Sequence, residues 1–182
     1  MSILTATAAS LHADVKPMVQ LAISGGGDTL NEAHDADGDT TSLTAGAGVS
    51  IEIGLDMQLT PTVPELSTQA FVGYKYDSVE ATNGDVDFSR ITLNILESYR
   101  IGKIKLGGGL TYHLNPTYSE DIDHIEGEFN YDNALGGIIQ VGYEVDPTVT
   151  IGLRAMIINY EKEGTTEEKN GNSFGIFANY TF

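Results

Sequence analysis

The stretch SFGIFANYTF, residues 173–182, places an apolar side chain at every second position. In an extended chain its two faces would differ, because one face carries Phe174, Ile176, Ala178, Tyr180 and Phe182 and the other carries Ser173, Gly175, Phe177, Asn179 and Thr181. A period of two is typical of a β-strand whose faces meet different surroundings. The sequence therefore predicts a strand at residues 172–182.

The same alternation recurs along the whole chain, and no segment keeps a helical period. In residues 42–56, for example, every second residue from Leu43 to Leu55 is apolar, while the other face holds Gly, Ser, Thr and acidic residues. We expect eight strands, at residues 16–26, 42–56, 67–77, 88–101, 103–114, 129–145, 148–161 and 172–182. The fold class is all-β.

The links between these segments alternate between short turns and longer polar loops. An even number of strands connected in this way is the layout of an outer-membrane barrel, and segments of about 11 residues suffice to cross a bilayer at a tilt. Aromatic residues near the strand ends would form the interfacial girdles; these are Tyr74, Tyr76, Tyr99, Tyr112, Tyr131, Tyr143, Tyr160, Tyr180 and Phe182.

A soluble barrel or sandwich is the alternative, and it would pack the apolar face inward as a core. The second face of the strands, however, is rich in Gly, Ser, Thr, Gln and isolated charges, which suits a narrow polar lumen. We therefore predict an eight-stranded antiparallel up-and-down transmembrane β-barrel, closed by pairing of the first strand near residues 19–24 with the last near residues 174–180.

Over residues 14–182 the chain resembles the small eight-stranded outer-membrane barrels of the OmpA and OmpX kind, which are porin-like in architecture. The most specific match is the terminal FGIFANYTF, and LGGGLTYHLNP at residues 106–116 is also similar to a stretch of such proteins. The resemblance implies a monomer at the Gram-negative cell surface, in contact with outer-membrane lipid and lipopolysaccharide. It also implies a signal read by the barrel-assembly machinery, formed by Phe174, Ile176, Tyr180 and Phe182.

The composition excludes several functions. The net charge of −17 disfavours nucleic acid as a partner, and the absence of Cys removes disulfides and thiolate chemistry. Residues 1–13, MSILTATAASLHA, are small and apolar without an acidic residue, which is typical of a signal-peptide remnant; the alternative is a tail without fixed structure. The barrel domain would then be residues 14–182.

Most of the 26 acidic residues fall in or beside the long links, where only Lys162 and Lys169 oppose them. They would form a solvated, mutually repulsive outer surface, or would bind Ca²⁺ or Mg²⁺ and bridge to lipopolysaccharide phosphates. The stretch DADGD resembles a calcium loop through Asp35, Asp37 and Asp39, but it lacks the distal Glu at the required spacing. We therefore assign no metal site and no cofactor.

The inward face carries a second set of polar residues, Glu52, Lys75, Arg90, Lys105, Gln140, Glu144 and Arg154. Side chains fill an eight-stranded barrel, and unpaired charges there are costly, so we expect a network in which Glu52 joins Arg154 or Lys105. Such a network would be a plug or a gate. Glu97 breaks the alternation, and we expect a bulge near Leu96 to turn it inward.

Signals for an enzyme are poor. Lipid-modifying barrels combine His, Ser and a carboxylate, but His113 and His124 have no neighbouring Ser in a motif. The sequence favours a non-enzymatic barrel with a structural or surface-interaction role, acidic extracellular loops and a plugged lumen. A narrow gated channel for ions or small solutes is the alternative, and a lipid-modifying enzyme comes third.

Overall fold

A computed structural model describes residues 14–34, 40–58, 62–81, 84–122 and 125–182. Eight strands build the barrel: β1 (Asp14–Gly25), β4 (Gly48–Gln58), β5 (Leu66–Ala81), β6 (Gly84–Ile101), β7 (Ile104–Ile122), β9 (Ala134–Glu144), β10 (Val149–Ile157) and β13 (Ser173–Thr181). The others are β2 (Thr29–His34), β3 (Thr40–Thr44), β8 (Ile125–Asn130), β11 (Asn159–Glu161) and β12 (Glu168–Asn170).

The barrel is closed and antiparallel throughout. Its strands follow the order β1, β4, β5, β6, β7, β9, β10 and β13, and β13 pairs again with β1. In that closing ladder Val19 lies opposite Tyr180, and Ser24 lies opposite Gly175. Closure satisfies the backbone of every strand, which a sheet inside hydrocarbon requires. The predicted fold class and the predicted pairing of the first and last strands are both confirmed.

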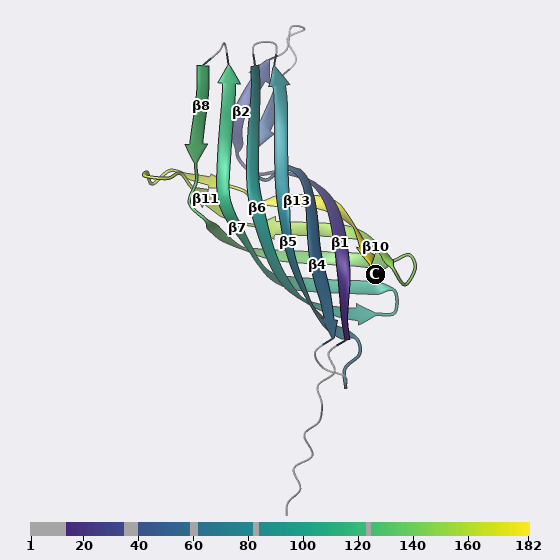
Figure 1. Cartoon of the computed structure of the whole chain (residues 1–182). Helices are drawn as coiled ribbons and strands as arrows, with labels where there is room; N and C mark the ends of the chain where they lie inside the picture. Colours follow the sequence, from purple (N-terminus) through teal and green to yellow (C-terminus); the bar gives the residue numbers. More distant parts are fainter. Residues whose placement is uncertain (1–13, 35–39, 59–61, 82–83, 123–124) are drawn as a thin grey trace, which may run out of the picture.

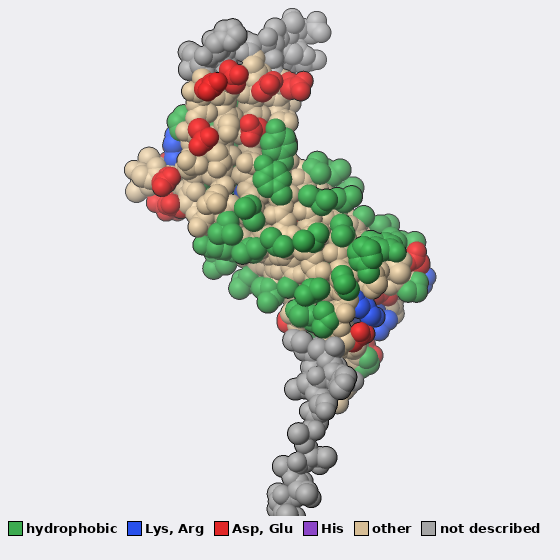
Figure 2. Space-filling model, in the orientation of Figure 1, with side chains coloured by type: hydrophobic (Ala, Val, Ile, Leu, Met, Phe, Trp, Pro, Cys, Tyr) green, Lys and Arg blue, Asp and Glu red, His purple; other side chains and the backbone are tan. Residues whose placement is uncertain are grey.

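The outside of the barrel is apolar and the inside is polar. On β13, Ile176 is 59% exposed and Tyr180 is 47% exposed, whereas Phe177 and Asn179 face inward and are buried. Figure 2 shows apolar side chains as a band across the visible face of the molecule, and exposed large apolar residues lie on all eight barrel strands, so we call this band the belt. This arrangement is the reverse of a soluble core, and it identifies the belt as the surface that meets lipid. Aromatic residues mark its edges: Tyr74 and Tyr76 above, and Tyr99, Tyr143, Tyr180 and Phe182 below.

The links expected to be polar loops are largely β-structure. Strands β5 and β6 stay paired up to Ala81 and Gly84, and β8 pairs with the upper part of β7. Figure 1 shows β5, β6, β7 and β8 rising together with the β2–β3 hairpin above one side of the barrel. We call this part the wall. It forms because the alternation continues above the belt, where Val79, Val86 and Phe88 are buried.

Three predicted strands are interrupted, and this changes which residues face outward. The segment expected at 42–56 breaks between β3 and β4, where Gly48 begins β4 with a φ of 126° that suits glycine. Leu43 and Ala45 are consequently buried instead of facing lipid.

The segment expected at 129–145 breaks between β8 and β9, and the one at 148–161 breaks between β10 and β11. Because of these breaks Tyr131 and Tyr160 are buried, so they were wrongly assigned to the girdles. Both tyrosines pack edge-on against Phe88, at centroid distances of 5.8 Å and 5.5 Å.

The expectation for Glu97 is also wrong. The irregularity in the β6–β7 ladder lies between Ser89 and Ile91, and Leu96 itself is buried in the lumen. Glu97 therefore stays on the outer face, where Thr68 Oγ1 donates a hydrogen bond to its carboxylate over 2.8 Å. A neighbouring hydroxyl on the next strand offsets part of the cost of an outward charge.

Several expectations lie outside the described residues. The signal-peptide remnant at 1–13 and the acidic stretch with Asp35, Asp37 and Asp39 both belong to them. Within the ranges that the structure describes, no group of three or more His, Asp or Glu could hold a metal ion. The same ranges contain no helix long and apolar enough to cross a membrane.

Candidate functional site

Glu52 lies at the centre of a buried polar network in the lumen. It points inward from β4, because it alternates with the lipid-facing Ile51 and Ile53. Arg154 Nη1 donates to Glu52 Oε1 over 2.8 Å, and Gln20 Nε2 donates to Glu52 Oε2 over 2.9 Å. The carboxylate is therefore both paired and hydrogen-bonded, as a buried charge has to be.

The network continues from Arg154 towards the lower end of the barrel. Arg154 Nη2 donates to Gln140 Oε1 over 3.2 Å, and Gln140 Nε2 donates to Gln69 Oε1 over 2.9 Å. Gln69 Nε2 then donates to Asp56 Oδ2 over 3.1 Å, and Lys105 Nζ donates to the same oxygen over 2.7 Å. One line of hydrogen bonds thus crosses the lumen from Glu52 to Lys105 and joins strands on opposite sides.

The upper lumen is filled by the turn at residues 45–47, between β3 and β4. Lys75 Nζ donates to the carbonyl of Gly46 over 2.7 Å, and Arg90 Nη2 donates to the carbonyls of Ala47 and Ala45 over 2.8 and 3.2 Å. A side chain at Gly46 would collide with the backbone of Asn172. Two buried cations therefore hold backbone oxygens, and they fix this turn, which we call the plug.

Above the plug the interior is aromatic. His113 is fully buried, and its Nδ1 lies 2.6 Å from the hydroxyl of Tyr160. Tyr160 packs against Phe88 and Tyr131. His113 is thus hydrogen-bonded to a tyrosine, and among the residues described no Ser hydroxyl is hydrogen-bonded to it.

The lower end of the lumen opens into a cavity of about 550 Å³, whose lining includes the Asp56–Lys105 pair. Glu144 also lines this lower mouth and, within the described ranges, has no Lys, Arg or His nitrogen within 4.0 Å. A second cavity, of about 20 Å³, lies deeper between Glu52, Lys75 and Arg154 and has room for one water molecule.

The lumen residues named from the sequence fall into three groups. Glu52, Gln140, Arg154 and Lys105 share the network, Lys75 and Arg90 bind the plug instead, and Glu144 lies apart at the lower mouth. Sequence reasoning missed three members of the network, Gln20, Asp56 and Gln69. Asp56 lies on the polar face of its strand, so the alternation that revealed Glu52 could have revealed it too.

The four residues of the proposed assembly signal lie on the outer face of β13. Phe174, Ile176, Tyr180 and Phe182 are all exposed. Tyr180 and Phe182 meet edge-on, with a centroid distance of 5.0 Å, at the lower edge of the belt. They form an apolar strip on the outer face.

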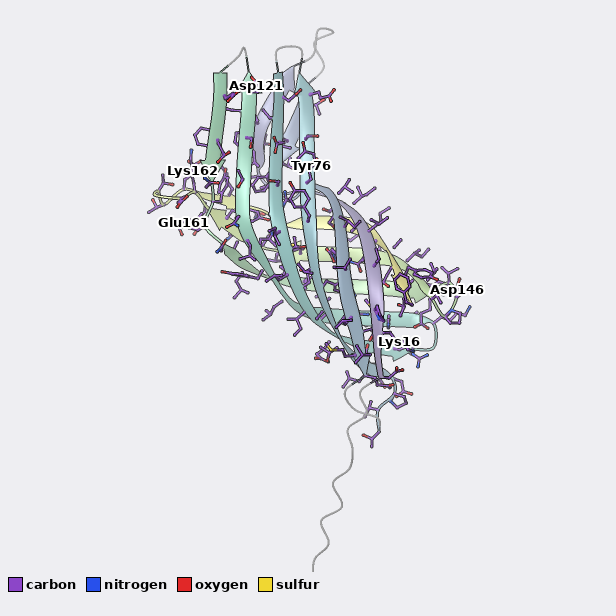
Figure 3. All side chains as sticks on the ribbon, viewed as in Figure 1. Lys16, Tyr76, Asp121, Asp146, Glu161 and Lys162 are labelled. Carbon is purple, nitrogen blue, oxygen red and sulfur yellow. The ribbon has the colours of Figure 1, made fainter. Side chains whose placement is uncertain are left out.

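A further cavity, of about 270 Å³, lies above the aromatic interior, on the inward-facing side of the wall where it meets the β11–β12 hairpin. We call it the outer cleft. Residues from β2, β7, β8 and the β11–β12 hairpin line it: Leu30, Asn31, Tyr118, Glu120, Phe129, Tyr131, Lys162, Glu167 and Lys169. Figure 3 shows Lys162 and Glu161 at the foot of the wall, below Asp121 at its top.

The side chains of the outer cleft are held in place by one another. Asn31 Nδ2 donates to the Tyr118 hydroxyl over 2.6 Å, and that hydroxyl donates to Glu120 Oε2 over 2.9 Å. Burial raises the pKa of Tyr118 to about 12, and the bond to Glu120 acts in the same direction. Lys169 lies 3.0 Å from Glu167, and this hydrogen bond raises the pKa of Lys169.

A closed eight-stranded barrel with an apolar exterior and a polar, filled interior is a β-barrel of the bacterial outer membrane. No family model matches the chain, and no curated protein matches its sequence. Several solved structures are similar to it in fold, and Neisserial surface protein A and Ail are among them.

Neisserial surface protein A is 13% identical with a TM-score of 0.58, and the match covers 93% of this chain and 99% of that one. Ail, the attachment invasion locus protein of Yersinia pestis, is 11% identical with a TM-score of 0.57, and the match covers 92% and 97%. That Ail structure is a complex with the heparin analogue sucrose octasulfate. The likeness confirms the resemblance to small outer-membrane barrels.

Proposed function

We propose that this protein is a non-enzymatic surface-interaction barrel, in which the barrel anchors the chain and the wall makes the contacts. The wall is the observation that carries the proposal. Strand β7 is 19 residues long and β6 is 18, although about 11 residues suffice to cross a bilayer. Both strands extend past the belt as paired β-structure, and such a rigid extension suits recognition.

The negative charge of the wall affects which partners it can bind. Its exposed acidic residues, which include Asp85, Asp121, Glu126 and Glu128, gather at the end far from the belt, as the acidic side chains in Figure 2 illustrate. A surface of this charge attracts cations and repels polyanions. We expect it to meet lipopolysaccharide phosphates through divalent cations, and to bind sulfated ligands such as the heparin analogue seen with Ail poorly.

The lumen supports a plugged scaffold. The plug closes the upper lumen, and the network from Glu52 to Lys105 fills the space below it. A gated channel is the second candidate, and the small cavity beside Glu52 together with the open lower mouth favours it. Conduction would require the plug to withdraw.

The outward strip on β13 supports a role as assembly signal, read by the barrel-assembly machinery before the barrel closes. Exposure of Phe182 and Tyr180 on the same face makes both side chains accessible. The barrel has no unpaired edge once β1 and β13 have joined, which is consistent with a monomer.

The proposal is tested by shortening the wall. A variant in which residues 119–128 are replaced by a two-residue turn keeps the pairing of Thr117 with Asn130 but removes the upper β7–β8 hairpin. Cells displaying this variant should attach less to an epithelial monolayer than cells displaying the parent at equal surface level. The matched control replaces residues 163–166, at the tip of the other hairpin. Equal attachment of parent and shortened variant would refute a contact role for the wall.

A further inference from the structure

Among the described residues, the outer cleft gathers both lysines of the long links. The chain has nine Lys and Arg residues, and Lys162 and Lys169 alone come from the long links. Both line the cleft, and both are half-buried while their neighbours in the hairpin are exposed. Because the surrounding surface is strongly acidic, this cleft is the place at this end where an anionic group would be least repelled.

The two lysines differ in how they are neutralised. Lys169 is paired with Glu167 over 3.0 Å. Lys162 Nζ lies 4.1 Å from the centre of the Phe129 ring, and in the described part of the chain no carboxylate oxygen lies within 4.0 Å of it. Lys162 therefore forms no direct ion pair in the cleft, and the Phe129 ring packs against its ammonium group.

The other residues that line the outer cleft are apolar or can accept hydrogen bonds. Tyr118 and Phe129 stack at a centroid distance of 5.9 Å, and Leu30 and Tyr131 add apolar surface. Glu120 and Glu167 lie on the same lining, and their carboxylates can accept hydrogen bonds. A ligand that fits would combine one anionic group, a ring with C–H surface, and several hydroxyl donors.

We propose that the outer cleft binds a single acidic sugar unit, a hexuronate ring of a surface polysaccharide, with its carboxylate on Lys162. The volume of 270 Å³ lies just below the ~300–1,000 Å³ typical of sites for drug-sized ligands, so the cleft suits one ring. The C–H groups of the ring contact the aromatic walls, and its hydroxyls donate to Glu120 and Glu167. This inference rests on the proposed function, because the cleft must face the outside of the cell.

The test measures sugar binding to the full barrel refolded in detergent micelles. Sodium glucuronate is the probe, and glucose is the neutral comparator; saturation-transfer NMR titrations report both. Glucuronate should bind about tenfold or more tightly than glucose, because a hydrogen bond to a charged group contributes more than a neutral one. Equal binding of glucose and glucuronate, or no binding of glucuronate, would overturn the proposal.

Two variants locate the binding. Lys162→Gln should weaken glucuronate binding about tenfold and leave glucose unaffected, whereas Lys162→Arg should retain it. Lys103→Gln, an exposed basic residue at the lower turn, is the matched control and should change nothing. Unchanged binding by Lys162→Gln would refute the assignment, and so would equally tight binding of inorganic phosphate.

The two proposals fail separately. If glucuronate does not bind while attachment still depends on the wall, only the sugar site is wrong. If glucuronate binds through Lys162 while shortening the wall leaves attachment unchanged, the sugar site stands and the wider contact role fails.

Discussion

Glu52 on β4 and Arg154 on β10 meet inside the barrel, with 2.8 Å between Oε1 and Nη1, although β1 and β13 lie between their strands in the sheet. The pair therefore spans the lumen. It links strands across the barrel interior, so we expect its loss to change both the stability and the permeability of the protein.

Glu52→Gln should destabilise the barrel, because it leaves the buried Arg154 without its counter-charge. Breaking a buried pair from one side costs about 3 kcal/mol in such surroundings. Urea unfolding in detergent measures this loss, with the exposed Glu128→Gln as the control. Unchanged stability together with a rise in single-channel current would instead favour a gate.

Lys75→Met should loosen the plug. The substitution removes the ammonium that holds the Gly46 carbonyl, while Arg90 still holds the neighbouring carbonyls. We expect channel openings in planar bilayers that the parent lacks, and none from the control Lys103→Met. A variant as silent as the parent would show that the turn stays in place without Lys75.

Gly152→Ala should destabilise the barrel by about 1–3 kcal/mol, the usual cost of overpacking. A Cβ at this position would collide with the backbone carbonyl oxygen of Val141 and would lie 2.7 Å from two atoms of the Phe177 ring, which faces the lumen. Gly137→Ala is the control, since no heavy atom lies within 4 Å of its Cβ. In a double-mutant cycle Phe177→Leu should recover only the part of the loss that is due to the ring, because the Val141 carbonyl stays in place; additive effects would contradict a contribution from the ring.

The stability of the lower turn should depend on pH, because the turn is held by the carboxylate of Asp146. The backbone N–H of Thr148, its hydroxyl and the N–H of Val149 all donate to Asp146 over 2.8–2.9 Å, and these bonds lower the pKa of Asp146. A lowered pKa in the folded state means that the turn is stabilised above the unfolded pKa, about 4, and loses this support as the pH falls through the folded value. NMR titration should place the midpoint below that of a free Asp. A midpoint at or above it would contradict these bonds.

Phe182→Ser should reduce the yield of barrel in the outer membrane more than it reduces the stability of refolded protein. Phe182 is exposed at the edge of the belt, so it contributes little to internal packing. Pulse-chase assembly in cells and unfolding in detergent give the two quantities. Leu135→Ser, which removes an equally exposed side chain from β9, is the control. If Phe182→Ser assembles into the outer membrane as well as the parent does, Phe182 is not part of an assembly signal.

Period-two alternation was sufficient to predict the barrel, its closure and its lipid-facing surface. In a membrane barrel one face of each strand has to be apolar, and Ile176 and Val141 lie on such faces. It could not reveal the plug. Ala45 and Ala47 continue the pattern of residues 42–56 without a break, and only the positive φ at Gly48 and the cations across the lumen fix the turn.

The wall escaped sequence reasoning for a related reason. Its strands carry many acidic residues, and this composition indicated solvated loops. Val79 and Val86 nevertheless alternate with the charged residues and are buried. The outer cleft joins β2, β7, β8 and the β11–β12 hairpin, which lie far apart in the sequence. No local spacing could bring Asn31 beside Tyr118.

The position of the plug also bears on the order of events during assembly. Its holders, Lys75 and Arg90, lie on β5 and β6, which follow the turn closely along the chain, whereas the seam between β1 and β13 joins the two ends of the sequence. Contacts between near neighbours form before distant ones, because closing a long loop costs more entropy. The turn can thus settle on a curved, still open sheet, and the last strand then encloses an interior that is already filled.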